Sequence, residues 1–219
     1  MRYLLAALLA LPASAQITVG ADVSVGPSLT TLGASGTVEA AGVPIPLGRV
    51  DFPTSVGVDA RARVEVHNGT WGARVGAGLL SASDVFDGAS FFDRRSVDLA
   101  FAVASGELTY RQPYGPAEVV VGVGPEVRVV LDEDDPRGDL LSLLGDVRRS
   151  HLALGGSVGA RFDLGGVTLA PELRGGYALT PLSDDTVFAD VIPGVDTSVR
   201  LAGDFRFNHV SLSLTVGTP

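Results

Sequence analysis

The stretch from Thr54 to Leu80 most constrains the fold, because apolar residues alternate along it with small or charged ones. A period of two is typical of β-strands, in which successive side chains point to opposite faces. His67-Asn68-Gly69-Thr70 interrupts the pattern, and Asn-Gly favours a two-residue hairpin turn because both residues tolerate positive φ angles. Each arm has about ten alternating residues, the length that a tilted strand needs to cross a bilayer. The stretch therefore predicts one hairpin of a transmembrane β-barrel.

The same alternation recurs along the rest of the chain and predicts eight strands in all. They cover residues 16–31, 56–66, 71–80, 97–110, 118–129, 152–163, 167–179 and 205–216. Long connections, such as Leu32 to Pro53, alternate with short ones, such as Arg111 to Pro116. In the first long connection, Gly36 to Val43 is suited to extend strands beyond the membrane. An even strand number with this alternation is typical of bacterial outer-membrane barrels, so we expect an all-β, eight-stranded antiparallel up-and-down transmembrane β-barrel with short periplasmic turns and long extracellular loops.

Two of the predicted strands change the parity of their apolar positions. In residues 97–110 the change predicts a β-bulge at Ser105-Gly106. In residues 205–216 it predicts a register slip near Asn208-His209. Both interpretations keep the large apolar residues of these strands on the lipid-facing side.

The N-terminal segment and the composition indicate an exported chain. Met1 to Ala15 combines Arg2, an apolar run and Ala13-Ser14-Ala15, which predicts a cleaved signal peptide followed by a barrel domain over residues 16–219. The chain has no cysteine, which excludes disulfides and thiolate metal sites. Its formal net charge of -9 argues against a nucleic-acid partner. Mean hydropathy is +0.32 although no later run of eighteen apolar residues exists, so the apolar side chains must fill a core or face lipid.

The second face of the strands indicates which side meets lipid. A soluble β-protein would place Thr, Lys, Gln and Glu there, whereas this face carries mostly Gly, Ala and Ser with single ionic residues. Small residues suit the narrow interior of an eight-stranded barrel, and Arg beside carboxylates in a confined space favours a cross-lumen ion network. The predicted lumen network consists of Asp59, Arg61, Arg63, Glu65, Arg74, Glu118, Glu126, Arg128, Arg161, Asp163, Glu172 and Arg174.

The first hairpin turn constrains that network. With Asn68-Gly69 as a two-residue loop, Arg63 lies opposite Arg74, and like charges directly opposed across strands are unfavourable. Carboxylates must therefore lie beside them, with Glu65 as the local candidate and Glu126 and Glu172 reaching across from other strands. We expect such a network to exclude a continuous water column.

Taken together, the chain resembles the small eight-stranded bacterial outer-membrane β-barrel proteins of the OmpA/OmpX type. The resemblance covers Gln16 to Val216 and rests on the signal peptide, the strand number and the alternation of loop lengths. It implies localisation in the outer membrane, with membrane lipid and the barrel-assembly machinery as partners. An aromatic girdle beside the short turns agrees with it and consists of Trp71, Tyr110, Tyr114 and Phe162. The chain departs from many such proteins by ending on Val216-Gly217-Thr218-Pro219 and not on an aromatic residue.

Few residues offer catalytic or metal-binding chemistry. Only His67, His151 and His209 supply imidazole groups, and we interpret them as solvated or interfacial. His151 lacks the Ser that a lipid hydrolase would place two positions on, and none of the long connections contains the His that a protease cleft would need. An acidic run without EF-hand spacing is usually a solvated loop, so calcium binding is kept only as the alternative to it. The calcium candidates are Asp132, Glu133, Asp134 and Asp135. We predict no catalytic residues, no metal and no cofactor.

The leading functional hypothesis is an integral outer-membrane barrel without catalytic activity, structural or adhesive, with acidic extracellular loops. One alternative is a narrow porin or transporter for small solutes. A second is a soluble secreted β-barrel that binds an apolar ligand, and an outer-membrane hydrolase is the weakest. The sequence names no ligand.

Overall fold

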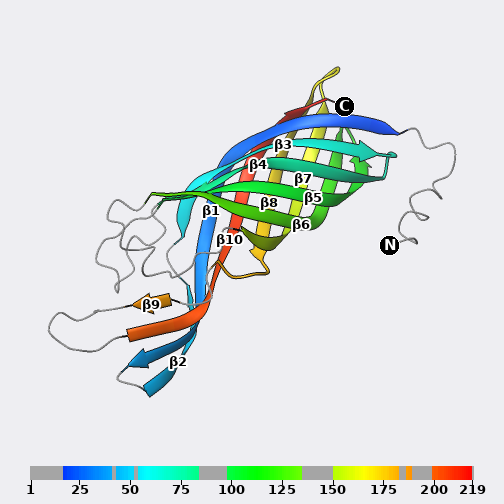
Figure 1. The fold of residues 1–219 in the computed structure, drawn as a ribbon. Coiled ribbons are helices and arrows are strands. Elements are labelled where there is room, and N and C mark those ends of the chain that lie inside the picture. The colour runs from blue at the N-terminus through cyan, green and yellow to red at the C-terminus, as the bar shows by residue number, and fades with distance from the viewer. Residues whose placement is uncertain are drawn as a thin grey trace.

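The computed structural model describes residues 17–40, 43–51, 54–83, 98–134, 150–182, 186–188 and 199–218. Within them it contains ten β-strands (Figure 1). They are β1 (Thr18–Ala40), β2 (Val43–Asp51), β3 (Ser55–His67), β4 (Trp71–Ala82), β5 (Asp98–Tyr114), β6 (Ala117–Asp134), β7 (Ser150–Asp163), β8 (Thr168–Ala178), β9 (Thr186–Phe188) and β10 (Val199–Gly217). Among the described residues, no helix is long and apolar enough to cross a membrane. The predicted signal peptide lies outside the described residues.

Eight of the ten strands close a barrel. Their order is β1-β3-β4-β5-β6-β7-β8-β10, and β10 pairs back onto β1, with every neighbouring pair antiparallel. The short turns after β3, β5 and β7 lie at the end where β10 finishes, here named the turn end (Figure 1). The opposite end carries the long connections and is named the loop end. The expected eight-stranded antiparallel barrel is confirmed.

Strands β1 and β10 continue past the other barrel strands at the loop end (Figure 1). They stay paired as far as Glu39 and Arg200. Strand β2 adds to the outer part of β1, and β9 adds to the outer part of β10. The result is a four-stranded projection that includes most of the Gly36–Val43 segment. The sequence did not predict β2 or β9, because Pro44 and Pro46 are poor strand residues and β9 is only three residues long.

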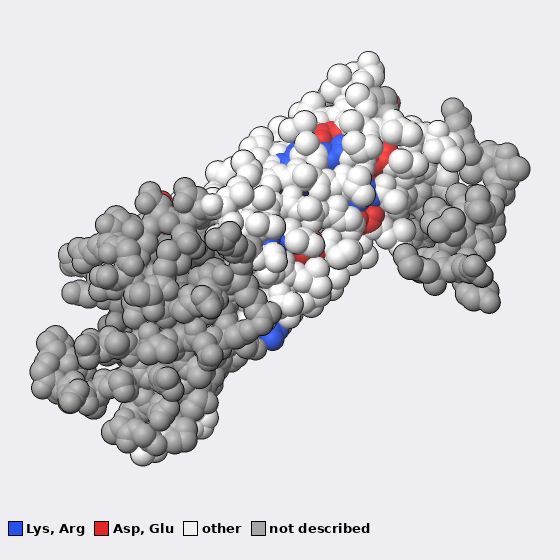
Figure 2. Space-filling view, viewed as in Figure 1, with Lys and Arg blue, Asp and Glu red and all other residues white. Residues whose placement is uncertain are grey.

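The barrel wall is apolar outside and polar inside over most of its height. In β3, Arg61 and Arg63 are 2% and 3% exposed, whereas Val64 and Val66 are 46% and 44% exposed. The described part of the wall in Figure 2 is correspondingly white over most of its area, with charged residues visible in a few patches. Large outward apolar residues include Val23, Val25, Leu29, Val58, Val75, Leu79, Val123, Val127, Leu154, Val158, Leu173, Leu212 and Leu214. They form a continuous surface suited to hydrocarbon, which we name the apolar belt.

Strands β5 and β10 keep one register where parity changes were predicted, so both of those interpretations are wrong. The β10–β1 ladder is regular through Asn208-His209, and the β5–β4 ladder is regular through Ser105-Gly106. The irregularity of β5 lies instead against β6, between Ala100 and Phe101. The apolar residues that suggested a slip all point into the barrel and are at most 7% exposed: Leu99, Phe101, Val103, Phe205 and Phe207.

An exchange of polarity between the two faces explains the apparent parity change. Near the loop end, outward positions of β1, β4 and β10 become polar, at Thr31, Ser81 and Asn208, and those of β5 become alanine, while the inward positions of these strands become apolar. The preceding outward positions are still apolar, as at Leu29 and Leu79. The strands therefore pass beyond the apolar belt and there alternate like those of a soluble β-protein, with the apolar side inside.

The β3–β4 hairpin turns at Gly69-Thr70, not at Asn68-Gly69. The main-chain N–H of Asn68 donates to the carbonyl of Trp71 at 2.9 Å, which leaves two residues between them. Gly69 has a φ of 92°, and a glycine with positive φ at the first central position fits a tight hairpin turn.

This turn changes the register that the sequence had predicted. Arg74 lies opposite Glu65, and Arg63 lies opposite Gly76. The predicted opposition of Arg63 and Arg74 is wrong. The observed register replaces two like charges with two unlike ones, which is the favourable cross-strand arrangement.

Candidate functional site in the barrel interior

Arginines and carboxylates fill the part of the interior nearer the turn end, in equal number. Six of each are 9% exposed or less among the described side chains. They are Arg61, Arg63, Arg74, Arg111, Arg128 and Arg174, with Asp22, Asp59, Glu65, Glu107, Glu126 and Glu172. We name these twelve residues the interior network. Because an unpaired buried charge is very unfavourable, each must find a partner.

The interior network consists of three clusters along the barrel axis. The middle one surrounds Glu172 on β8. Its Oε1 accepts hydrogen bonds from Arg63 Nη1 at 2.5 Å and Arg174 Nη2 at 3.0 Å. Its Oε2 accepts one from Arg74 Nη1 at 3.1 Å. Three guanidinium groups from three strands therefore meet at one carboxylate, which alone cannot neutralise them.

Glu107 and Asp22 supply the remaining negative charge of this part. Glu107 Oε2 accepts a hydrogen bond from Arg74 Nη2 at 2.5 Å, and its Oε1 accepts one from Arg174 Nη1. Arg63 Nε donates to Asp22 Oδ1 at 2.6 Å. Three arginines thus share three carboxylates, and the middle part is neutral.

A second cluster surrounds Glu126 on β6, closer to the loop end. Glu126 accepts from Arg61 Nη1 at 2.6 Å and from Arg128 Nε at 2.7 Å. Arg61 Nε also donates to Asp59 Oδ1 at 2.7 Å. Arg128 Nη1 donates to the main-chain carbonyl of Phe207 at 2.6 Å, so this cluster reaches the wall of β10.

His151 and His209 are both 3% exposed, so the expectation of solvated or interfacial histidines is wrong for them. His209 Nδ1 lies 2.9 Å from Arg128 Nη2. Because a guanidinium can only donate, Nδ1 accepts this hydrogen bond. The other ring nitrogen, Nε2, lies 3.5 Å from Arg61 Nη2 and 3.8 Å from Asp59 Oδ2. His151 packs edge-on against Phe101, and neither of its ring nitrogens has a hydrogen-bond partner among the described residues.

A third cluster lies near the turn end around Glu65. Glu65 Oε1 accepts from Arg111 Nε at 3.1 Å and from Thr109 Oγ1 at 2.7 Å. Arg111 Nη1 also donates to Glu118 Oε2 at 2.8 Å. The Glu118 side chain is 27% exposed, so it marks the mouth of the barrel.

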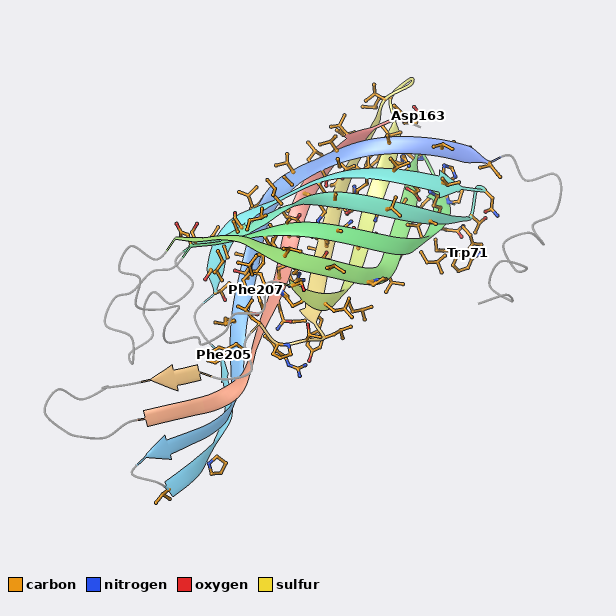
Figure 3. The ribbon with its side chains drawn as sticks, in the orientation of Figure 1. Trp71, Asp163, Phe205 and Phe207 are labelled. Carbon is orange, nitrogen blue, oxygen red and sulfur yellow. The ribbon has the colours of Figure 1, made fainter. Side chains whose placement is uncertain are left out.

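Two residues of the predicted lumen network do not make its ion pairs. Arg161 donates to Thr168 Oγ1 at 3.1 Å and to the carbonyl of Thr218 at 2.6 Å, without a carboxylate partner among the described residues. Asp163 is exposed in the β7–β8 turn (Figure 3), where its Oδ1 accepts from the main chain of Gly165 at 3.0 Å. The strand ends there, so this carboxylate caps the turn and does not enter the lumen. Arg161 lines the interior near the turn end, and the structure places the other ten predicted residues in the interior or at its mouth as well.

Asp22, Glu107 and Arg111 are network residues that the predicted set does not contain. Asp22 lies on β1. Glu107 on β5 directly follows the predicted bulge at Ser105-Gly106, and Arg111 was assigned to the short connection, whereas β5 continues to Tyr114. Leu108 and Tyr110 are exposed apolar and aromatic residues. Strict alternation with these two outward positions was the signal that identifies Glu107 and Arg111 as inward.

Apolar side chains fill the interior between the network and the loop end. The rings of Phe101 and Phe207 are 4.7 Å apart between centroids, and the Arg128 guanidinium lies 5.8 Å from the Phe207 ring centroid. Figure 3 shows Phe205 and Phe207 toward this end of the barrel. We name the buried apolar set the apolar layer: Leu32, Leu80, Ala82, Leu99, Phe101, Val103, Ala153, Ala178, Leu182, Phe205 and Phe207.

Two inward-facing glycines leave room for the network. A Cβ atom at Gly122 would lie 2.6 Å from Glu107 Oε2 and 2.7 Å from Ser157 Oγ. A Cβ atom at Gly176 would overlap the guanidinium of Arg128. The network side chains therefore occupy the space that a side chain at either glycine position would need.

A small cavity lies inside the barrel, and a larger hollow lies on its outer wall. A cavity of about 20 Å³ near the turn end is lined in part by Arg161, Glu172 and Thr215, which is room for about one water molecule. A larger hollow of about 540 Å³ lies on the outer wall of β1, β3 and β4, where Ala21, Ala62 and Ala77 line it.

The predicted girdle residues lie on the outer wall near the turn end. Trp71 and Tyr110 are 53% and 37% exposed, and their rings meet edge to face with centroids 5.0 Å apart (Figure 3 labels Trp71). Tyr114 and Phe162 are also exposed, at 77% and 36%.

The calcium candidates fall at the edge of what the structure describes. Asp132, Glu133 and Asp134 form the end of β6, and their side chains lie outside the described part. Asp135 lies outside the described residues altogether. Among the side chains that are described, no three His, Asp or Glu residues are grouped to hold a metal ion.

Comparison with known proteins finds the architecture but no sequence relative. No protein-family model matches the chain, and no curated protein matches it. The outer membrane protein OprG from Pseudomonas aeruginosa is similar in structure, with a TM-score of 0.52 at 14% identity over 90% of this chain and 95% of OprG. The chain has the fold of the small outer-membrane β-barrels.

Two further solved barrels align over similar lengths with lower scores. Neisserial surface protein A has a TM-score of 0.43 at 13% identity, over 89% of this chain and 97% of its own. Ail of Yersinia pestis has a TM-score of 0.42 at 10% identity, over 91% of this chain and 98% of its own. At these identities the likeness concerns the fold alone.

Proposed function

We propose that this protein is an integral outer-membrane β-barrel without catalytic activity, whose interior is closed to solutes and whose loop end is structural or binds partners at the cell surface. Membrane lipid and the barrel-assembly machinery are its proposed partners. The single observation that carries the proposal is the filling of the interior by two successive layers of side chains, the interior network and the apolar layer.

The exterior supports insertion into a membrane. Valine and leucine side chains on every barrel strand are exposed by about half, which would be unfavourable in water over so large a continuous surface. Lipid removes that cost, and Trp71 and Tyr110 lie where an interfacial girdle is expected. The same surface disfavours the soluble secreted barrel.

The interior supports closure. The described cavity inside the barrel has room for about one water molecule. A passing ion would first have to separate short Arg–carboxylate pairs and then cross a segment lined by Phe101 and Phe207. Both steps are unfavourable, because the first breaks buried pairs and the second removes the ion from water.

The loop end supports a role at the cell surface. The projection of β1, β2, β9 and β10 extends the barrel wall beyond the apolar belt (Figure 1). By contrast, the buried histidines do not favour hydrolysis, since His151 and His209 are enclosed in the interior where a membrane or soluble substrate does not reach.

Two measurements test the proposal. In cells, the protein should stay in the outer-membrane fraction after high salt and carbonate and leave it only with detergent. Reconstituted in planar bilayers, it should give no discrete conductance steps, while a porin inserted in the same way serves as the positive control. Release by carbonate would contradict membrane integration, and reproducible steps would favour the narrow porin.

A further inference from the structure

The contact between β1 and β10 joins the two strands that are farthest apart in the chain. We name it the closure seam. Its pairs run from Asp22 with Gly217 to Glu39 with Arg200. A hairpin pair is held by its own turn, whereas the seam must bring distant segments together against chain entropy. Its register therefore depends on its own ladder and on the side chains that cross it.

The ladder of the closure seam is interrupted at Gly26-Pro27. Strand β1 pairs with β10 at residues 22–25 and again from Ser28, whereas its pairing with β3 continues without a gap. Proline has no N–H to donate, and at Gly26 the strands approach so closely that a Cβ atom would overlap the main-chain oxygen of Leu212. The interruption leaves a short seam segment at the turn end, where residues 22–25 pair with residues 214–217.

Arg63 crosses this short segment on the inside of the barrel. Its Nε donates to Asp22 Oδ1 on β1 at 2.6 Å, and its Nη2 donates to Thr215 Oγ1 on β10 at 3.0 Å. Its Nη1 donates to Glu172 Oε1 on β8 at 2.5 Å. The side chain belongs to β3, so one guanidinium connects four successive strands, with one bond on each side of the seam.

The outer surface gives the same segment little support. The hollow of about 540 Å³ in the wall lies here and is lined by Ala21, Val23 and Val216, among others. Val23 and Val216 are 61% and 47% exposed, so the lipid-side surface buried across this segment is small. The charge-assisted bonds of Arg63 inside are stronger than neutral hydrogen bonds.

We propose that Arg63 is a latch for the turn-end segment of the closure seam. It holds β1 against β10 on the turn-end side of the Gly26-Pro27 interruption. Its loss opens this segment while the rest of the barrel stays closed. This role is local and separable from the general contribution of the interior network to stability.

Amide hydrogen exchange of the bilayer-reconstituted protein tests the latch. In Arg63→Gln, the amides of residues 19–25 and 214–218 should exchange about tenfold faster, while those of β5 and β6 keep their wild-type rates. Arg111→Gln is the matched control, because Arg111 bonds Glu65 on β3 and Glu118 on β6 without touching the seam. It should leave the exchange of the seam amides unchanged.

Two further variants keep the test decisive if Arg63→Gln folds poorly. Thr215→Val removes only the bond on the β10 side and should raise exchange in the same two segments by about threefold. A disulfide between Val23→Cys and Val216→Cys, which are directly paired across the seam, should restore protection in Arg63→Gln. The pair Ala62→Cys and Ala77→Cys across β3 and β4 should not.

Three results would overturn the latch. The first is an equal rise in exchange over all strands in Arg63→Gln and Thr215→Val. The second is an unchanged seam in both variants. The third is restoration of protection by the β3–β4 disulfide to the same extent as by the seam disulfide.

Discussion

The two halves of the barrel interior are filled by opposite chemistry inside one continuous wall. Toward the turn end, arginines and carboxylates pair around Glu172 and Glu126. Toward the loop end, Phe101 and Phe207 pack against each other with no charge between them. The outward positions change in the opposite sense, from valine and leucine to residues such as Thr31.

The difference shows that the surroundings of the wall determine the chemistry of the lumen. Where the outward positions contact hydrocarbon, the apolar residues of each strand are used there, and the alternate positions are left for polar groups. Where the wall is in water, the apolar residues form the core. The two halves should also respond differently to mutation, since a buried charge needs its partner whereas an apolar core needs mainly volume.

Removal of a shared carboxylate from the network should have the largest effect. Glu172→Ala should lower the free energy of unfolding by about 4 kcal/mol, because three buried guanidinium groups lose a common partner. Urea unfolding in lipid vesicles measures this. Glu118→Ala, at the exposed mouth, is the control and should cost less than about 1 kcal/mol. Equal losses would mean that water reaches the middle of the network.

Removal of volume from the apolar layer should have a slightly smaller effect and a different tolerance. Phe101→Ala should cost about 3 kcal/mol through the cavity that it leaves, whereas Phe101→Leu should cost about 1 kcal/mol. The same unfolding assay applies. A loss from Phe101→Leu as large as that from Phe101→Ala would show that the layer is not filled by interchangeable apolar volume.

A charge placed on the outer wall should separate the belt from the wall beyond it. Val123→Arg, central among the outward apolar positions of β6, should cost about 2–3 kcal/mol in bilayers. Thr31→Arg, outward but past the belt, should stay within about 0.5 kcal/mol of wild type. Comparable costs at both positions would place the membrane boundary elsewhere.

A methyl group added inside the network should have the smallest of these effects. Gly122→Ala should cost about 1–2 kcal/mol, because its Cβ would meet Glu107 and Ser157. Gly106→Ala faces outward with nothing within 4 Å and should be neutral within error. Thermal unfolding in detergent compares the two variants, and a neutral Gly122→Ala would contradict the tight packing of the network.

The sequence was sufficient to predict the number of barrel strands, the loop alternation and the faces within the belt. In a membrane, the arginines Arg61 and Arg63 of β3 must face the interior, so the alternate residues Ala62 and Val64 face the lipid. Beyond the belt, alternation still defines two faces but not which of them encloses the core, so Phe101 and Phe207 were assigned to lipid.

Local geometry accounts for the other errors. Asn68-Gly69 and Gly69-Thr70 are both acceptable hairpin turns, and only the pairing of Arg74 with Glu65 along the whole hairpin selects the second. Asp163 continues the inward alternation of β7, but the strand ends there and the carboxylate caps the turn. The second outcome depends on no residue pattern that is visible in the sequence.

Cysteine labelling tests the exchange of polarity most directly, because the chain contains no cysteine of its own. Single cysteines at Val25 and Val127 would lie in the belt, and those at Thr31 and Ser81 would lie beyond it. In intact proteoliposomes, a membrane-impermeant maleimide should label Thr31→Cys and Ser81→Cys rapidly and should reach Val25→Cys and Val127→Cys only after unfolding. Equal labelling at all four positions, or faster labelling of the two valine sites, would contradict the account.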